Sequence, residues 1–244
     1  MDVEIGTVLV TGGASGLGRA VADAVAKAGG TPAVLDRAEP ASLARDYAFE
    51  QVDLADTRAA EAAVRRVAGR LGGLDAVVTA AGTDACGDFE EVAAEAWERV
   101  VAVNLLGTAA VIRAALPFLE RRGEQGAGQR PGQRAGRVVT VASTLGLRAL
   151  PAATAYCASK FGVIGFSRAL AVELAGRVGV TCLVPGGMST AFFDGRPERF
   201  KPAPDQRLNR PEDVAETVMF ALRQPLGCEV RELVVTPSVE PSWP

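Results

Sequence analysis

The sequence predicts a single α/β domain built on a doubly wound parallel sheet of about seven strands. Short apolar runs alternate with alanine-rich helical patterns along the chain, which is the order that βαβ units produce. A length of 244 residues with 48% apolar residues can supply one large core, and single α/β domains commonly reach this size. A glycine-rich turn between the first expected strand and the first expected helix is the third observation.

The expected elements follow one another along the chain in the order strand, helix, strand. Apolar runs predict strands at residues 7–11, 32–36, 48–53, 75–79, 137–142, 179–184 and 231–235. Helical patterns predict helices at residues 17–28, 57–71, 90–119, 154–176 and 212–223. Asp56 and Pro211 are typical helix starts. Ligands of such sheets bind beyond the carboxyl ends of the strands, where the candidate site residues Gly12, Asp36, Asp53, Gly82, Ser143 and Pro185 fall.

The glycine-rich turn, residues 12–18, runs directly from the first expected strand into a helical pattern. Gly12 permits a tight turn, Gly16 lets the backbone approach a pyrophosphate, and Gly18 allows the helix to pack closely on the strand. The amides at the start of the helix would face the phosphates. A glycine-rich turn alone is more often a plain loop, but its position here favours a dinucleotide cradle.

Tyr156 and Lys160 are spaced so that their side chains share one face of a helix. A nearby ammonium lowers the pKa of a phenol, so Tyr156 is a candidate general acid or base near neutral pH. Ser143 lies a short way upstream, where its hydroxyl could hold a carbonyl or alcohol oxygen. The alternative is an ordinary pair on a helix surface.

The chain has no histidine. This absence removes the His-dependent catalytic triads and the commonest zinc ligand, so no metal site is expected.

The segments Thr11-Gly12-x-x-x-Gly16-x-Gly18 and Tyr156-x-x-x-Lys160 resemble the short-chain dehydrogenase/reductase family, in its compact branch with a Rossmann-like fold. The resemblance implies a catalytic set of four residues, Asn104, Ser143, Tyr156 and Lys160. It also implies that residues 185–190, Pro-Gly-Gly-Met-Ser-Thr, hold the nicotinamide carboxamide. The chain departs from the family at residues 79–82, where Thr-Ala-Ala-Gly replaces the usual Asn-Asn-Ala-Gly.

The cofactor-binding residues implied by the resemblance and the glycine turn are Gly12, Ser15, Gly16, Leu17, Gly18, Asp36, Arg37, Asp53, Leu54, Ala80, Ala81, Gly82, Tyr156, Lys160, Pro185, Gly186, Met188 and Thr190. Asp36 ends the second expected strand, and a carboxylate there accepts hydrogen bonds from the adenine ribose and repels a 2′-phosphate. Ser15 stands where NADP-using relatives often carry a basic residue. The neighbouring guanidinium of Arg37 argues the other way, because it can pair with a phosphate. We expect NAD, with NADP as the alternative.

The expected reaction is reversible hydride transfer between the nicotinamide and a secondary alcohol or ketone. Tyr156 would move the proton and Ser143 would orient the oxygen. Lys160 would lower the pKa of Tyr156 and bind the nicotinamide ribose, and Asn104 would hold a water that joins Lys160 to solvent, as in the family. A non-catalytic dinucleotide-sensing regulator would not need these four residues. A sugar-nucleotide epimerase of the extended branch would need a larger substrate domain after Thr190.

Residues 188–210 are the expected substrate lid. Leu145, Phe192 and Phe193 would line the substrate pocket, although the two phenylalanines would equally serve to dock this segment on the core. No fixed cation is evident to pair with an anionic substrate. We therefore expect a medium-sized, largely apolar alcohol or ketone, such as a cyclic or 3-oxoacyl compound, in preference to a sugar or a small charged acid.

Residues 120–136 form an expected flexible insertion, rich in Gly, Gln and Arg. Its arginines could bind an anion, but this composition is typical of a solvated loop.

The chain has four cysteines, Cys86, Cys157, Cys182 and Cys228. They lack the spacing of metal ligands and are expected to be reduced thiols. Cys157, next to Tyr156, is interpreted as a packing residue in preference to a redox group.

Bulk properties favour a cytoplasmic enzyme whose partner is a small molecule. The net charge of −3 without a long basic run gives no support for nucleic-acid binding. No apolar run approaches the roughly 18 residues of a membrane span, and the amino terminus lacks the pattern of a signal peptide. By resemblance, the last helix and strand are expected to form the contacts of a homotetramer or homodimer.

Overall fold

The computed structural model describes residues 4–39, 47–124 and 136–240. Its centre is one parallel sheet of seven strands, in the order β3-β2-β1-β4-β5-β6-β7. The strands are β1 Thr7–Thr11, β2 Thr31–Asp36, β3 Ala48–Gln51, β4 Ala76–Thr79, β5 Gly136–Val141, β6 Val178–Pro185 and β7 Glu232–Val235. The predicted doubly wound sheet is confirmed, and its order reverses between β1 and β4, where such sheets open a crevice.

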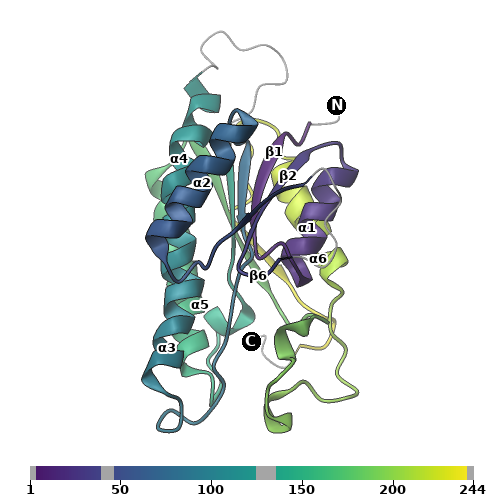
Figure 1. Ribbon diagram of the computed structural model, residues 1–244. Coiled ribbons are helices and arrows are strands. Elements are labelled where there is room, and N and C mark those ends of the chain that lie inside the picture. The colour runs from purple at the N-terminus through teal and green to yellow at the C-terminus, as the bar shows by residue number, and fades with distance from the viewer. Residues whose placement is uncertain (1–3, 40–46, 125–135, 241–244) are drawn as a thin grey trace.

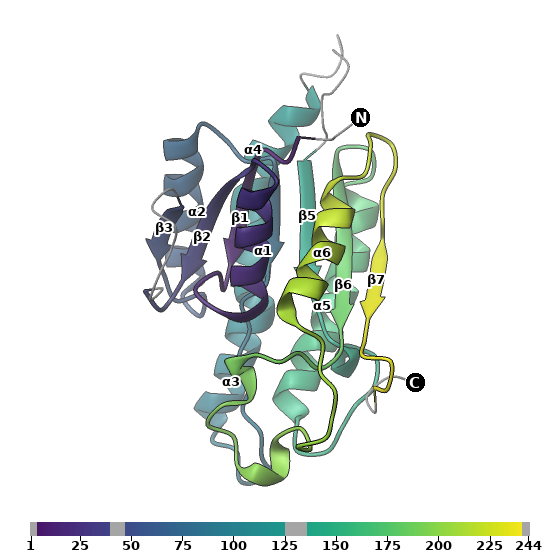
Figure 2. The ribbon, with the colours of Figure 1, turned by 90° about the vertical axis from the view of Figure 1, so that its right-hand side faces the viewer.

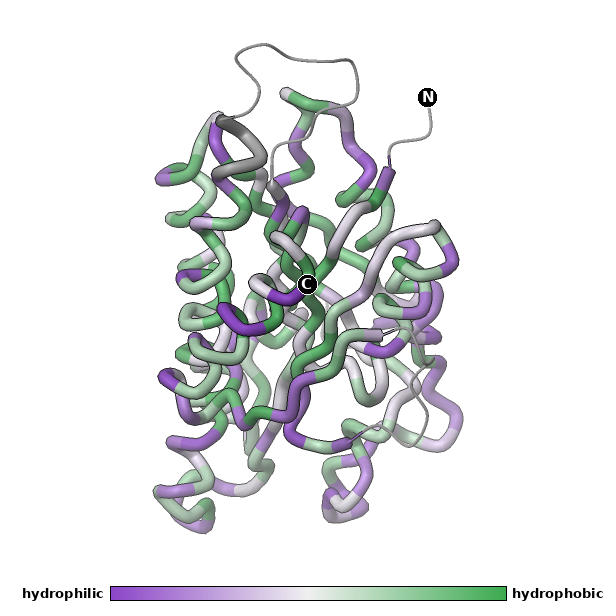
Figure 3. Tube along the Cα trace, turned by 45° about the horizontal axis from the view of Figure 1, so that its top comes forward, coloured by the Kyte–Doolittle hydropathy of each residue, from purple (hydrophilic) through white to green (hydrophobic). Residues whose placement is uncertain are grey.

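Helices cover both faces of the sheet (Figure 1). One face carries α1 Gly16–Lys27 and α6 Pro211–Leu222, and the other carries α2 Thr57–Leu71, α4 Thr108–Glu124 and α5 Thr154–Glu173. Val8 and Val10 of β1 pack under α1 and α6, whereas Leu9 packs under α2 and α4. Because both faces are covered, the strands are continuous apolar runs, and Figure 3 shows hydrophobic colour concentrated along them.

Two of the predicted helix starts are confirmed by their local geometry. The Asp56 side chain accepts hydrogen bonds from the amides of Arg58 and Ala59, at 3.1 and 3.0 Å, and so satisfies two free amides at the start of α2. Pro211 occupies the first position of α6, where its missing N–H costs nothing. Gly72 ends α2 with a φ of 74°, a conformation that favours glycine.

The expected helix at residues 90–119 is shifted and contains an irregularity. It begins as α3 Ala94–Val101, passes through the π-helical turn η1 Ala102–Gly107, and continues as α4 to Glu124. The first five residues of the expected insertion are therefore helical, and residues 125–135 lie outside the described residues. Sequence periodicity did not reveal the π turn, because a shift of one residue within a short apolar pattern gives no distinct signal.

The stretch Ala94–Glu120 is the one helix in the described part of the chain that is long and apolar enough to cross a membrane. Half of the most apolar 18-residue stretch of this helix is buried against the rest of the fold. The core helix of a globular protein satisfies the same test, so this finding is weak evidence for a membrane span.

The segment at residues 188–210 leaves the carboxyl end of β6 and has little regular structure. It contains the short 3₁₀ turns η4 Ala191–Phe193 and η5 Glu198–Phe200. An isolated bridge between Met188 and Asn209 brings its two ends together. Figure 2 shows this segment below the sheet, at the end where the strands finish.

Candidate active site

A cleft of about 1340 Å³ opens at the carboxyl ends of the strands. All of the residues predicted to bind the cofactor line it, together with Ser143, Tyr156 and Lys160. The predicted substrate residues Leu145, Phe192 and Phe193 line it as well. Asn104 is the exception, because it is buried behind the wall of the cleft.

The glycine turn has the conformation and the clearance that a dinucleotide cradle requires. Gly12 and Gly16 have φ values of 71° and 53°, in the left-handed region that favours glycine. A Cβ at Gly12 would lie 2.7 Å from the Cα of Ala81, and a Cβ at Gly18 would overlap the Gly12 carbonyl oxygen. The turn therefore presents bare backbone to the cleft at the start of α1, an arrangement that fits a pyrophosphate.

Asp36 sits at the end of β2 beside this turn. Its Oδ2 accepts a hydrogen bond from the Ala14 amide at 2.9 Å, and its Oδ1 accepts one from the Ala38 amide at 3.0 Å. These bonds fix the carboxylate at the cleft, and each oxygen keeps further acceptor capacity for a ligand hydroxyl. The neighbouring Arg37 lines the same part of the cleft.

Asp53 forms an ion pair with Arg99, a partner that the sequence did not predict. Its Oδ2 lies 2.8 Å from Nη2 of Arg99, and its Oδ1 accepts a hydrogen bond from the Ala55 amide at 3.0 Å. Partial burial raises the pKa of Asp53, but these bonds and the nearby guanidinium groups outweigh it, so the pKa lies below its usual value. Arg99 comes from α3 and also lines the cleft.

Residues 185–190 are held at the cleft by the carboxyl-terminal part of the chain. The Gly186 amide donates to the Val235 carbonyl and the Gly187 amide donates to Oε2 of Glu240, both at 2.9 Å. A Cβ at Gly16 would come within 3.5 Å of the Thr190 side chain, so this segment also faces the glycine turn. Glu240 lines the cleft, and no local pattern in the sequence indicated it.

Ser143 and Tyr156 bring two hydroxyl groups together on one side of the cleft. Ser143 follows β5, and its Oγ accepts a hydrogen bond from the Leu145 amide at 3.1 Å. Burial raises the pKa of Tyr156 to about 12, while a hydrogen bond with Ser143 acts in the opposite direction. The predicted lowering of the Tyr156 pKa by Lys160 is wrong for this arrangement, because desolvation of the phenol dominates.

Lys160 is buried, with 3% of its surface exposed. Its Nζ donates to the Val141 carbonyl at 2.8 Å and lies 5.5 Å from the centre of the Tyr156 ring. Burial lowers the pKa of Lys160 to about 8. The ammonium therefore sits behind the phenol ring and is anchored to the end of β5.

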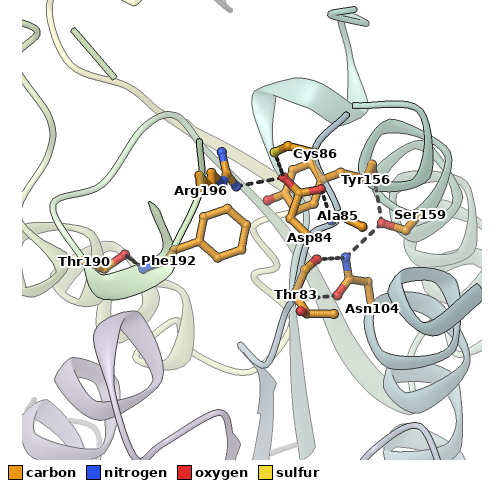
Figure 4. A network of polar contacts seen from close by, with 10 residues as sticks. All are labelled: Thr83, Asp84, Ala85, Cys86, Asn104, Tyr156, Ser159, Thr190, Phe192 and Arg196. Carbon is orange, nitrogen blue, oxygen red and sulfur yellow. Dashed lines mark hydrogen bonds and ion pairs between the residues drawn. The ribbon is translucent and has the colours of Figure 1, made fainter. Parts of the chain in front are cut away.

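Asn104 occupies the π-helical turn and holds the chain that follows β4 (Figure 4). Its Oδ1 accepts from the Thr83 amide at 2.8 Å, and its Nδ2 donates to the Thr83 carbonyl at 2.9 Å and to Ser159 Oγ at 3.0 Å. A Cβ at Gly82 would lie 3.6 Å from Oδ1 of Asn104 and 3.8 Å from Nζ of Lys160. Gly82 therefore lies close to both polar groups, and both Gly82 and Lys160 line the cleft.

The departure at residues 79–82 has a visible consequence. Thr79 Oγ1 is buried without a hydrogen-bond partner among the described residues. The Ala81 amide instead donates to Thr11 Oγ1 at 3.1 Å, so the hydroxyl of β1 supports this strand end.

A polar wall faces Tyr156 across the cleft, and the sequence did not predict it. Arg196 Nη2 lies 2.8 Å from Oδ2 of Asp84, and the guanidinium carbon lies 4.6 Å from the centre of the Phe192 ring. The Phe192 ring is 5.6 Å from the ring of Tyr156. No fixed cation that could pair with an anionic substrate was evident in the sequence; Arg196 is a cation in the cleft, but Asp84 already pairs with it. Arg196 was missed because an irregular segment brings it to Asp84, and periodicity carries no information about such a contact.

Cys86 belongs to the same wall. Its thiol donates to Oδ2 of Asp84 at 2.9 Å. Burial and this hydrogen bond raise the pKa of Cys86 to about 12, so the thiol stays protonated near neutral pH. Over the ranges 4–39, 47–124 and 136–240, no group of three or more Cys, Asp or Glu side chains could hold a metal ion.

Comparison with known proteins agrees with this geometry. The short chain dehydrogenase family model matches residues 6–199. The chain is 30% identical over 239 residues to 2-(S)-hydroxypropyl-CoM dehydrogenase 3 of Xanthobacter autotrophicus, covering 88% of each protein. It is 34% identical over 197 residues to 2-dehydro-3-deoxy-L-rhamnonate dehydrogenase (NAD(+)) of a Sphingomonas species, covering 78% of this chain and 75% of that protein.

A solved structure shows the same fold over nearly the whole chain. A short chain dehydrogenase from Burkholderia cenocepacia in complex with NADP superposes with a TM-score of 0.82 at 27% identity, covering 97% of this chain and 98% of that one. The glycine cradle, the sheet order and these matches lead to one assignment. The chain belongs to the short-chain dehydrogenase family and is an oxidoreductase.

Proposed function

We propose that the protein catalyses reversible hydride transfer between NAD and a secondary alcohol or ketone, with Tyr156 as the acid and base. The observation that carries this proposal is the meeting of Tyr156 and Ser143 hydroxyls in front of a buried Lys160, at the sheet end that also carries the glycine cradle. The nicotinamide, when bound, supplies the hydride acceptor or donor.

Tyr156 is the proton carrier in this proposal. With a pKa of about 12, its phenol is protonated at neutral pH and can donate to a ketone oxygen as that oxygen gains charge. Ser143 adds a second donor beside it and orients the same oxygen. Alcohol oxidation needs the phenolate, so this direction gains rate as the pH rises.

Lys160 and Asn104 support the proton carrier. Lys160 binds the nicotinamide ribose, and its ammonium, 5.5 Å from the centre of the Tyr156 ring, offsets part of the desolvation that raises the pKa of the phenol. Asn104 fixes the chain beside Gly82 through the Thr83 amide, and a Cβ at Gly82 would lie within 4 Å of both Asn104 Oδ1 and Lys160 Nζ. A water held there by Asn104 would connect Lys160 to solvent.

The cofactor proposed is NAD, on the strength of Asp36. The carboxylate stands at the end of β2 and is fixed by the Ala14 and Ala38 amides, where it would accept from ribose hydroxyls and repel a 2′-phosphate. One relative is named as NAD(+)-dependent, whereas the Burkholderia structure holds NADP. The test is kcat/KM with each cofactor for the native protein and for Asp36→Ala, which should shift preference towards NADP.

The substrate proposed is a medium-sized, largely apolar alcohol or ketone, such as a cyclic or 3-oxoacyl compound. Leu145, Phe192 and Phe193 give the cleft apolar walls near Tyr156. Residues 188–210 act as the lid over this part of the cleft, within one catalytic domain that spans residues 1–244. Arg196 does not oppose this proposal, because Asp84 already neutralises it.

The protein is proposed to act in the cytoplasm as a homotetramer or homodimer. Large apolar side chains are exposed on α6, on β7 and on the connection between them, with Phe220 54%, Leu226 50% and Val234 42% exposed. Exposed large apolar side chains favour association with another copy of the chain. The proposal assigns no nucleic-acid or membrane partner.

Absorbance at 340 nm tests the central proposal, because reduced nicotinamide absorbs there. The native protein should oxidise secondary alcohols with NAD or reduce ketones with NADH in a panel that includes cyclic, aryl and 3-oxoacyl compounds, polyols and hydroxy acids. Greater kcat/KM for the polar members would contradict the proposed substrate. Dinucleotide binding without any turnover across the panel would instead indicate a sensing function.

A further inference from the structure

The ion pair between Asp84 and Arg196 joins two parts of the molecule that are far apart in the sequence. Asp84 lies on the loop that follows β4 and Gly82, and Arg196 lies in the segment 188–210. Figure 4 shows Arg196 and Phe192 reaching from that segment towards Asp84 and Tyr156. Their Nη2 and Oδ2 atoms are 2.8 Å apart.

Both partners are withdrawn from water and fixed by further contacts. Only 15% of the Arg196 side chain and 7% of the Asp84 side chain are exposed. Asp84 accepts two more hydrogen bonds, from the Ala85 amide at 2.7 Å and from the Cys86 thiol at 2.9 Å. The Arg196 guanidinium lies over the rings of Phe192 and Phe193, at 4.6 and 4.7 Å. An ion pair held in this way interacts more strongly than one at the surface.

The other cations of segment 188–210 that line the cleft are paired as well. Arg199 lies 3.6 Å from Glu91, and Lys201 lies 2.9 Å from Glu198. The Arg199 pair is a surface pair, with 62% and 64% of the two side chains exposed. This pair is therefore both more exposed and longer than the pair of Asp84 with Arg196.

We propose that Asp84 and Arg196 determine substrate specificity, because their ion pair holds segment 188–210 over Tyr156 and leaves this wall of the cleft without net charge. The inference rests on the proposed oxidoreductase function of the same site. An uncharged ketone or alcohol meets a neutral wall there. A carboxylate near this wall must either compete with Asp84 for Arg196 or approach the Asp84 charge, and both cost free energy.

A matched pair of substrates tests the proposal, namely a 3-oxo ester and the corresponding 3-oxo acid, with the cofactor that the native protein uses. We expect kcat/KM for the ester to exceed that for the acid by about 100-fold in the native protein. Asp84→Asn keeps the shape of the side chain but frees the Arg196 charge, and it should reduce this ratio by at least about 10-fold, mainly through faster turnover of the acid.

Two further variants separate charge selection from loss of structure. Arg196→Lys keeps the positive charge and should retain most of the native ratio. Glu91→Gln removes the same charge from the exposed pair with Arg199, and it should leave the ratio within about twofold of native. Retained dinucleotide affinity in each variant shows that the fold is intact.

Hydrogen exchange gives a readout that does not depend on turnover. In the presence of dinucleotide, amides of residues 188–210 should exchange faster in Asp84→Asn than in native protein or in Glu91→Gln. Native preference for the acid, or an unchanged ratio in Asp84→Asn, would overturn the proposal. If the native protein reduces neither compound, the proposed function fails for this substrate class, and equal exchange in all variants would then overturn the role of the pair as well.

Discussion

At the scale of single residues, the environment of a group decides its chemistry more than its neighbours in sequence do. Tyr156 and Lys160 share a helix face as their spacing predicts, yet burial raises the pKa of the phenol and lowers that of the ammonium. Both shifts favour the uncharged forms of the two groups. Charging either group at this position therefore costs desolvation free energy.

Tyr156→Phe should lower kcat by at least about 100-fold, the usual size of lost acid and base help. The dinucleotide Kd should stay within about twofold, because only the hydroxyl is removed and the ring still packs against Phe192. Steady-state kinetics and a fluorescence titration measure the two quantities. Tyr47→Phe is the control, since Tyr47 is the other tyrosine and its hydroxyl bonds Asp23 away from the cleft. Retention of more than a tenth of native kcat in Tyr156→Phe would refute the assignment.

Lys160 should leave a signature in the pH dependence of stability. Its pKa is about 8 in the folded protein against a reference value of 10.5, so between these values the unfolded chain binds a proton that the folded chain does not. The free energy of unfolding contributed by Lys160 therefore rises as the pH increases from 8 to 10.5, and it is constant below pH 8.

Urea unfolding of native protein and Lys160→Met across this pH range measures the effect. The difference between their free energies of unfolding should move in favour of the native protein as the pH rises. Lys160→Met should also lose turnover and bind the dinucleotide more weakly. Lys27→Met, at an exposed position in α1, is the control, and a difference for Lys160→Met that does not change with pH would contradict the burial argument.

At the scale of elements, the glycine turn and the first helix form one unit whose spacing is set by close backbone contact. A methyl group at Gly18 would overlap the Gly12 carbonyl oxygen, so the turn or α1 must move to admit it. Both ends of this contact belong to the cradle that faces the cleft.

Gly18→Ala should therefore weaken dinucleotide binding by at least about 10-fold, since displaced amides no longer face the phosphates. Gly69→Ala is the matched control, because a Cβ there meets no atom within 4 Å on the exposed side of α2. That variant should bind dinucleotide normally and be more stable by about 0.5–1 kcal/mol, the helix preference of alanine over glycine. Equal affinities in the two variants would show that the turn tolerates the displacement.

At the scale of the whole molecule, patterns that repeat along the chain were predictable and contacts between irregular segments were not. The apolar strands from Thr7 to Val235 and the glycine turn each carry a local signal, which is why the sheet and the cradle were found from the sequence. The positions of the Asp84–Arg196 pair, the Asp53–Arg99 pair and Glu240 depend on how loops meet other loops or helices in space. The same holds for burial, which sets the pKa of Tyr156 and cannot be read from spacing.

Association between copies of the chain is a property of the whole molecule, and a substitution of Phe220 on α6 tests it directly. Phe220→Glu replaces an apolar side chain that is 54% exposed on α6 with a charged one, and it should shift the protein to a smaller species. Sedimentation velocity over a range of concentrations measures the change. Phe89→Glu, at a phenylalanine that is 67% exposed in the turn before α3, should leave the native mass unchanged. A native protein that sediments as a monomer would remove the basis of this proposal.

The π-helical turn η1 means that the helix from Ala94 to Glu124 carries one residue more than a regular α-helix would. Deleting one residue within η1 would restore regular α-helical winding, which removes the wide turn and moves the backbone that carries Asn104. Asn104 would then turn away from Thr83, and the loop after β4 would lose its anchor. The winding of a single helical turn therefore decides whether the chain beside Gly82 is held in place. Loss of one codon in this turn would be enough to release it.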